Sequence, residues 1–114
     1  MRGSMTRCWL AYSTVDSKEQ ADILARGLVD QQLVACVNIV GPLESVYRWQ
    51  GKVEQAKEWM LMMKCSESQC EELKMALPRL HGYEVPELIM MPIADGHAPY
   101  LDWIAASGKE SGYE

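Results

Sequence analysis

The chain of 114 residues contains no phenylalanine, only 2 histidines and no cluster of basic residues. Its 11 lysines and arginines stand against 16 acidic residues, so the formal net charge is −5 at pH 7. Because sequence-independent binding to phosphate backbones needs a basic face, we do not expect nucleic acid as a partner. The sequence also lacks an apolar run of the roughly 18 residues that a membrane-spanning helix needs, so no membrane partner is expected.

The cysteines show no CxxC spacing. There are four of them: Cys8, Cys36, Cys65 and Cys70. For the set as a whole, this spacing favours buried free thiols in a reducing compartment over metal ligation. The start of the chain has no apolar core of the kind found in signal peptides, which favours a cytoplasmic location.

The first four residues, MRGS, precede a second methionine and resemble an expression-vector leader. Residues 1–4 are therefore left out of the fold prediction, and residues 5–114 have the length of one domain. The composition, with 48% hydrophobic and 24% charged residues, is typical of a globular protein. We expect a single domain.

Runs of apolar and β-branched residues predict four strands. They are expected over residues 7–12, 33–40, 52–65 and 87–93. The second strand continues as extended chain to a turn at Gln50 and Gly51, which makes a long hairpin with the third strand. The hairpin has a polar tip and an apolar base.

Apolar residues at helical spacing predict helices between these strands and at the C-terminus. The first helix is expected to begin at a capping box formed by Asp16 and Glu19 and to end near Gln31 or Gln32. A short last helix is expected within residues 97–107.

A further helix is expected to begin at Ser66 or Ser68 and to end near residue 80. Its apolar face is predicted to carry Cys70, Leu73, Leu77 and Leu80. Pro78 falls in its last turn, where we expect a kink or a 3₁₀ finish.

The order of these elements is β-α-β-β-α-β followed by a helix, which predicts an α+β, ferredoxin-like fold with an antiparallel sheet and two helices on one face. Such a sheet has an uncovered face, yet the strands LVACVNIV, EWMLMMK and LIMMPI are apolar at nearly every position. We infer that the second face is buried against other copies of the chain in a closed symmetric oligomer.

Four segments carry a resemblance to a known family: ACVNIV at 35–40, SVYRWQGKVE at 45–54, LHGYEVPEL at 80–88 and YLDWI at 100–104. In this order and at these intervals they resemble the CutA1 family, also called divalent-cation tolerance proteins. One departure is Gly82, because the family commonly has proline at this position.

The resemblance implies a homotrimer like that of the PII signalling proteins, with long hairpins that wrap around neighbouring subunits. It also implies a non-enzymatic role in tolerance to divalent cations, copper in particular. A weakly bound Cu²⁺ or other divalent cation, not required for folding, is the implied cofactor, and an unidentified protein partner is an open alternative.

Three residues are the candidate metal contacts: His81, Glu84 and Cys36. Imidazole and carboxylate suit borderline cations, and thiolate suits softer ones. The alternatives are a structural His81 that caps the preceding helix with Glu84 as its partner, and a Cys36 that packs in the core. The adjacent methionines point to opposite strand faces, so core filling is favoured over a thioether site.

A cleft between subunits is the candidate ligand site. Its predicted lining is Tyr47, Trp49, Lys64, Tyr83, Glu87 and Tyr100. Lys64 ends an apolar strand, so we expect a carboxylate partner for it, Glu58 or Glu87. The rival function is a PII-like regulator that binds a small organic or anionic ligand in this cleft and acts on a protein partner. No catalytic motif is present, and a hydrolase that uses His81 and Glu84 as acid and base is the weakest alternative.

Overall fold

The computed structural model describes residues 6–108, so the expected leader at 1–4 lies outside the described residues. The strands are β1 (Cys8–Val15), β2 (Cys36–Trp49), β3 (Lys52–Ser66) and β4 (Ile89–Pro92). The helices are α1 (Lys18–Asp30), the 3₁₀ turn η1 (Glu67–Gln69), α2 (Cys70–Leu80) and α3 (Ala98–Ala106). Among these residues no helix is long and apolar enough to cross a membrane.

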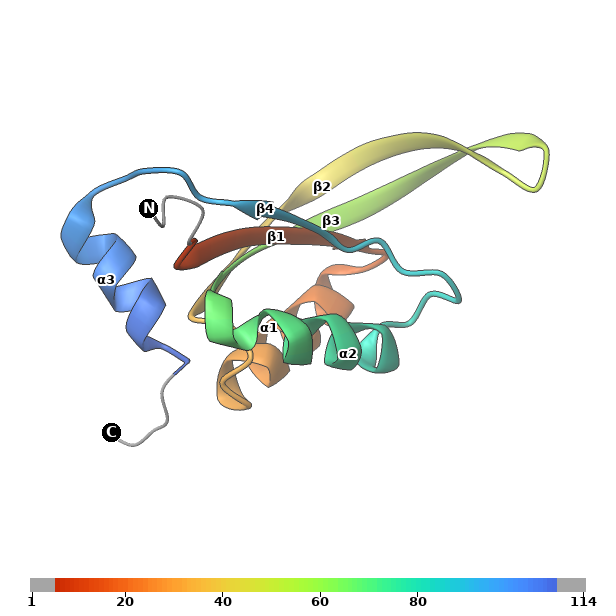
Figure 1. Ribbon diagram of the computed structural model, residues 1–114. Coiled ribbons are helices and arrows are strands. Elements are labelled where there is room, and N and C mark those ends of the chain that lie inside the picture. The colour runs from red at the N-terminus through yellow and green to blue at the C-terminus, as the bar shows by residue number, and fades with distance from the viewer. Residues whose placement is uncertain (1–5, 109–114) are drawn as a thin grey trace.

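The strands form one antiparallel sheet in the order β2-β3-β1-β4, which confirms the predicted ferredoxin-like architecture (Figure 1). The bounds of three strands differ from the prediction. β4 spans only Ile89–Pro92 and is shorter than the predicted 87–93. β1 continues to Val15 because it pairs with β3 along its whole length. β2 begins at Cys36, and the buried Leu33 and Val34 precede it. β2 then runs through Gly41 with only a shift of register, because its backbone still pairs with β3 on both sides.

The cap of α1 also differs from the prediction. The N-cap is Ser17, one residue later than expected, and its Oγ accepts a hydrogen bond from the backbone N–H of Gln20 at 3.0 Å. A hydroxyl at this position satisfies one of the backbone donors that the first helical turn leaves without a partner. The predicted cap, Asp16, is exposed and lies outside the helix.

The entry to α2 is a capping box around η1. The backbone N–H of Ser66 donates to Oε1 of Gln69 at 2.8 Å, so Ser66 begins the turn and Ser68 does not. The helix then continues through Pro78 to Leu80 as α-helix, without the expected 3₁₀ finish. Leu80 is 40% exposed, so the apolar face of the helix ends at Leu77.

The hydrophobic core lies between the sheet and helices α1 and α2, which cover the same face (Figure 1). Fully buried side chains from both layers meet there: Leu28, Leu61, Met63, Leu73 and Leu77. Truncating one of these leucines to alanine typically costs about 2–5 kcal/mol. This layer therefore supplies the main stabilisation of the single chain.

The opposite face of the sheet carries apolar side chains that neither α1 nor α2 covers. Residues paired across antiparallel strands point to the same side, and the register defines this open face as Leu10, Tyr12, Asn38, Val40, Met60, Met62, Ile89 and Met91. Thr14, Cys36, Glu58 and Lys64 point to the same side by the same register. Ile89 is 41% and Met91 38% exposed. α3 packs at one end of the sheet, where Ile104 is fully buried and Sγ of Cys8 donates to the carbonyl of Leu101 at 3.3 Å.

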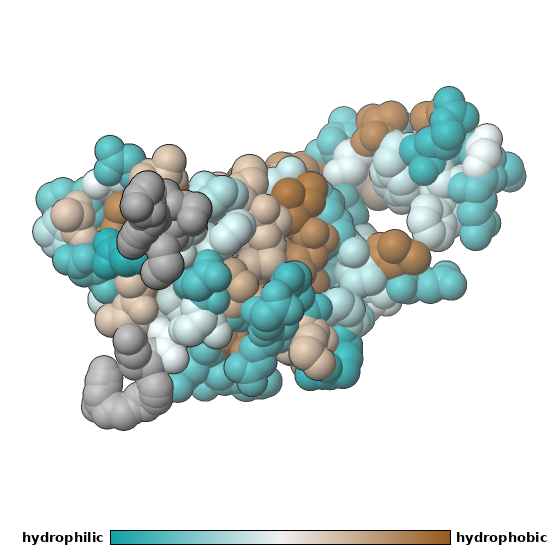
Figure 2. Space-filling view, in the orientation of Figure 1, coloured by the Kyte–Doolittle hydropathy of each residue, from teal (hydrophilic) through white to brown (hydrophobic). Residues whose placement is uncertain are grey.

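The β2–β3 hairpin extends beyond the sheet, because β1 pairs with β3 only from Trp59 to Ser66 (Figure 1). A two-stranded ribbon is marginally stable by itself in water. Figure 2 shows hydrophobic side chains on the surface of this protruding part, and Val46 and Val53 are each 66% exposed. The hairpin thus has the surface of a segment that contacts another chain.

The position of the α1 cap gives a stability prediction. Ser17→Ala removes the side-chain acceptor for Gln20 and should lower the free energy of unfolding by about 1 kcal/mol. Asp16→Ala should cost less, since its charge acts on the helix end only through the helix dipole. Urea denaturation of both variants measures the difference, and an equal or larger cost for Asp16→Ala would contradict the assigned cap.

Candidate functional site

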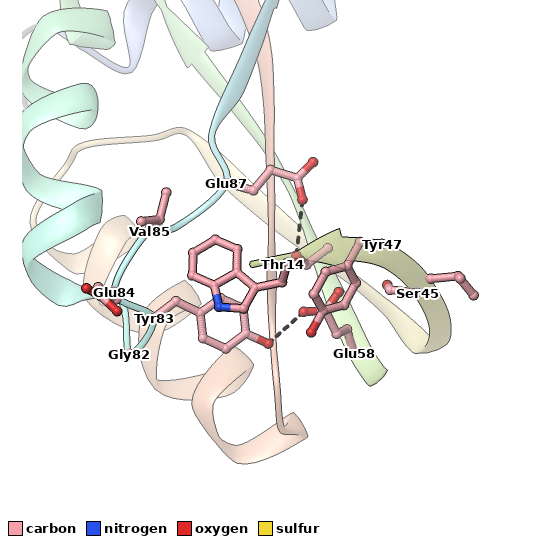
Figure 3. Close-up of a pocket in the computed structure, with 11 residues that line it drawn as sticks. Thr14, Ser45, Tyr47, Glu58, Gly82, Tyr83, Glu84, Val85 and Glu87 are labelled. Atoms are coloured by element: carbon pink, nitrogen blue, oxygen red, sulfur yellow. Dashed lines mark hydrogen bonds between the residues drawn. The ribbon is translucent and has the colours of Figure 1, made fainter. Parts of the chain in front are cut away.

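A pocket of about 720 Å³ lies between the β2–β3 hairpin, the end of β1 and the loop that follows α2 (Figure 3). Its lining is Thr14, Ser45, Val46, Tyr47, Trp49, Glu58, Gly82, Tyr83, Glu84, Val85 and Glu87. Thr14 pairs with Met60, and Glu58 lies two residues before Met60 on β3, so both point to the same side of the sheet as the open face and the pocket borders that face. A second copy on the open face would lie next to it.

Two hydrogen bonds hold the loop against the sheet at this pocket. The hydroxyl of Tyr83 donates to Oε2 of Glu58 at 2.6 Å, and Oγ1 of Thr14 donates to Oε1 of Glu87 at 3.2 Å (Figure 3). Glu58 is only 7% exposed. A buried carboxylate needs hydrogen-bond donors or a cation, and Tyr83 supplies one donor.

The pocket is acidic and aromatic. Among residues 6–108, its lining includes three glutamates and no lysine, arginine or histidine. Burial, together with the hydrogen bond to Glu58, raises the pKa of Tyr83 well above its ordinary value, so the phenol stays neutral. Tyr47 and Trp49 supply further aromatic wall from the hairpin.

His81 is buried beside the pocket, with 9% of its surface exposed, and both ring nitrogens are engaged. Nε2 lies 2.8 Å from the carbonyl oxygen of Thr14, and Nδ1 accepts the backbone N–H of Tyr83 at 3.0 Å. These partners require the neutral tautomer with the proton on Nε2. No hydrogen bond joins His81 to Glu84 in the described residues, so the predicted partner is wrong, and Glu84 is exposed.

Cys36 lies with Lys64 and Tyr100 at another part of the sheet. Cys36 and Lys64 are paired across β2 and β3, and Sγ of Cys36 is 3.7 Å from the Tyr100 hydroxyl. Lys64 donates to Oδ1 of Asn38 at 2.7 Å and lies 5.8 Å from the centre of the Tyr100 ring. The predicted carboxylate partner for Lys64 is therefore wrong, and an amide and an aromatic ring take its place.

One chain does not bring the three candidate metal contacts together. His81 is bonded to Thr14, which pairs with Met60, whereas Cys36 pairs with Lys64. The four-residue offset along β3 corresponds to about 13 Å. Among residues 6–108 no group of three or more histidine, cysteine, aspartate or glutamate side chains is placed to hold a metal ion.

The predicted cleft residues likewise fall into two groups. Tyr47, Trp49, Tyr83 and Glu87 line the pocket, while Lys64 and Tyr100 do not. The sequence-based prediction missed the lining residues Thr14, Ser45, Val46, Gly82 and Val85, and it offered Glu58 or Glu87 as the partner of Lys64. Since Glu58 and Lys64 lie six residues apart on one strand, about 20 Å, an ion pair between them is geometrically impossible.

Residues 9–107 match the family described as CutA1 divalent ion tolerance protein. The chain belongs to the CutA1 family. A CutA1 relative from Thermus thermophilus, named divalent-cation tolerance protein CutA, is 46% identical over 91 residues, which cover 80% of this chain and 88% of the relative.

A plant CutA1 relative from Oryza sativa, named protein CutA 1, chloroplastic, is 42% identical over 102 residues. The match covers 90% of this chain and 58% of the relative, so the chain spans a little over half of that protein's length. The crystal structure of CutA1 from Oryza sativa superimposes with a TM-score of 0.87 at 40% identity, over 95% of this chain and 99% of the other. None of these names describes a reaction.

The four cysteines of this CutA1 chain are free. Cys8 and Cys65 are buried as predicted, whereas Cys36 and Cys70 are partly exposed. Burial raises the pKa of the Cys65 thiol to about 12, which makes it a poor nucleophile at neutral pH. Of the two partly exposed thiols, only Cys36 lies on the open face.

The hydrogen bond between Tyr83 and Glu58 predicts a pH-dependent contribution to stability. Because folding raises the pKa of Tyr83 above 10.0, the contribution is complete below about pH 10 and is lost as the pH rises through the folded-state pKa. Tyr83→Phe should lower the free energy of unfolding at pH 8 by about 1 kcal/mol, and the difference from wild type should shrink near pH 11. Urea denaturation at both pH values measures this.

Tyr47→Phe is the matched control, because the Tyr47 side chain is 43% exposed and makes no hydrogen bond among the described residues. It should leave the free energy of unfolding and its pH dependence close to wild type. A Tyr83→Phe difference of the same size at both pH values would argue against the pKa shift.

Proposed function

We propose that the chain acts in divalent-cation tolerance as a non-enzymatic homotrimer that binds or senses divalent metal ions, copper in particular. The single observation that carries the proposal is the CutA1 family match over residues 9–107. The relative from Thermus thermophilus is named for divalent-cation tolerance, and we extend that role to this chain.

Two features of the surface support self-association. The open face presents methionine, isoleucine and leucine side chains, and the protruding hairpin presents Val46 and Val53 to solvent. A contiguous apolar surface of this kind on a chain of this size marks an interface. We propose that copies of the chain cover both surfaces in a PII-like trimer, since a closed symmetric assembly leaves no copy with an unfilled face.

Metal contact is proposed for residues that such an assembly brings together. Cys36 lies on the face that copies would share, and a thiolate suits copper in either oxidation state better than a hard cation. Glu84 is exposed and available to a neighbouring subunit. His81 contributes only after Nδ1 gives up the backbone N–H of Tyr83, which is consistent with weak binding.

We also propose a cytoplasmic location, because four free thiols suit a reducing compartment. The name of the plant relative places that protein in chloroplasts. A CutA from Archaeoglobus fulgidus is named periplasmic, so the locations in relatives' names differ. The proposal for this chain depends on its own cysteines.

Metal titration tests the binding role. Anaerobic calorimetry should show saturable binding of Cu²⁺ and of Zn²⁺ to wild type. Cys36→Ser should weaken copper binding by about tenfold or more, because a thiolate ligand is lost. His81→Ala should weaken binding of both ions more than His97→Ala, whose side chain is exposed and outside both candidate groups. Absent heats in wild type, or equal heats in all variants, would sink the metal role.

A second candidate function is a PII-like regulator that binds a small ligand between subunits and acts on a protein partner. The pocket of about 720 Å³ at the border of the open face favours it. Among residues 6–108 no basic side chain lines the pocket, which disfavours an anionic ligand. An organic ligand that raises the melting temperature, together with Cu²⁺ and Zn²⁺ that leave it unchanged, would support this function over the first.

Sedimentation velocity tests the assembly. Wild type should sediment as a trimer at micromolar concentration, and Met62→Glu should shift it towards monomer, because a charge on the open face would be buried without a partner. Met75→Glu is the matched control, since Met75 is 63% exposed on the helical side of the molecule. A monomeric wild type, or equal effects of the two substitutions, would contradict the proposed interface.

A further inference from the structure

We propose that the pocket beside Glu58 binds a small organic cation, an ammonium or guanidinium group on a short carbon chain. The inference goes beyond cation tolerance and does not depend on it. It names the chemical class of ligand for the pocket that Thr14, Tyr47, Trp49, Glu58, Tyr83 and Glu87 line.

The first argument is the charge of Glu58. The residue is only 7% exposed, and no lysine, arginine or histidine within residues 6–108 forms an ion pair with it. Oε2 accepts from Tyr83, and within the same residues no donor is bonded to Oε1, which is open to solvent, since Ser13 Oγ is the only fully buried side-chain oxygen or nitrogen without a partner among these residues. A largely buried carboxylate whose second oxygen has no protein donor favours a cationic donor that enters the pocket.

The second argument is that the other charged groups of the pocket are also negative. Glu84 and Glu87 add two carboxylates to the lining, and no basic residue of the described part of the chain lines the pocket. An anion would meet repulsion from all three glutamates. Low-dielectric walls strengthen the attraction of a cation, because field lines concentrate in a cleft of one sign.

The third argument separates an organic cation from a metal ion. Tyr47, Trp49 and Tyr83 line the pocket, and aromatic faces attract ammonium and guanidinium groups while they contact the attached carbon chain. A divalent metal would need several close oxygen ligands, and the described residues hold no such group of three. The volume of about 720 Å³ is also far larger than one ion and suits a small molecule.

Figure 3 shows how the groups are arranged. The Tyr83 hydroxyl and the Glu58 carboxylate meet, and Glu87 lies with Thr14 at another side of the pocket. The two carboxylates thus come from separate elements, β3 and the loop before β4. A diamine with a short chain matches this arrangement better than a single ammonium group does.

The test uses 1,4-diaminobutane as the probe and the assembled wild-type protein, with calorimetry at about 150 mM salt to screen non-specific surface attraction. We expect saturable binding, and no binding of 1,4-butanediol, which has the same length without charge. Glu58→Gln keeps an acceptor for Tyr83 and removes the charge, so it should weaken binding at least about tenfold. Glu87→Gln, on the exposed side of the pocket, should weaken it by a smaller factor.

Glu44→Gln is the matched control, since Glu44 is exposed on the hairpin and does not line the pocket. Its affinity for the diamine should equal that of wild type. The proposal is overturned if wild type shows no saturable binding, if butanediol binds equally, or if the Glu58 and Glu44 variants behave alike. A further outcome would also overturn it: wild type does not bind the diamine, and Glu58→Gln weakens the homotrimer. In that case a basic side chain of a second copy occupies the pocket.

Discussion

The constraint on which this molecule depends is that two helices cover a sheet whose strands are apolar on both faces. Leu61 and Met63 of β3 are fully buried beneath α1 and α2, while Met60 and Met62 alternate with them and point to the other side. The same strand therefore builds the core of one chain and a surface that one chain cannot cover. Folding and self-association follow from one segment of sequence.

This constraint also fixes where a site can form. Glu58 lies on the same side of β3 as Met60 and Met62, at the point where β1 ends and the ribbon of the hairpin begins. With β1 absent beyond Val15, the loop after α2 fills the space next to the strand, and a pocket remains between loop and hairpin. The pocket is thus a consequence of strands of unequal length.

The order of elements and the sheet could be predicted because they depend on local periodicity and on the length of connections. Boundaries were less certain, since Asp16 and Ser17 are both good caps and only the backbone geometry selects Ser17. Tyr83 and Glu87 were found because a motif carries them. Thr14 and Glu58 were not placed with them, because that requires knowing which strands pair and in what register.

The loop itself shows why single residues in a motif should be judged by their contacts. Gly82 stands where the family commonly has proline, yet a Cβ added there meets nothing within 4 Å, and its φ lies outside the positive range that favours glycine. Nothing in the fold demands glycine at this position. The loop is instead held by its neighbours: His81 bonds to β1 through Thr14, and Tyr83 bonds to β3 through Glu58.

Because these bonds lie on both sides of Gly82, they limit the freedom that glycine gives the backbone between them. The imidazole of His81 is hydrogen-bonded at both nitrogens, to the Thr14 carbonyl and to the Tyr83 backbone N–H. The residue that most resembles a metal ligand in the sequence is therefore the one that joins the loop to β1 in the folded chain. A ligand that needs His81 must compete with the fold. A ligand that needs the Glu58 carboxylate meets an oxygen that the fold leaves without a donor among the described residues.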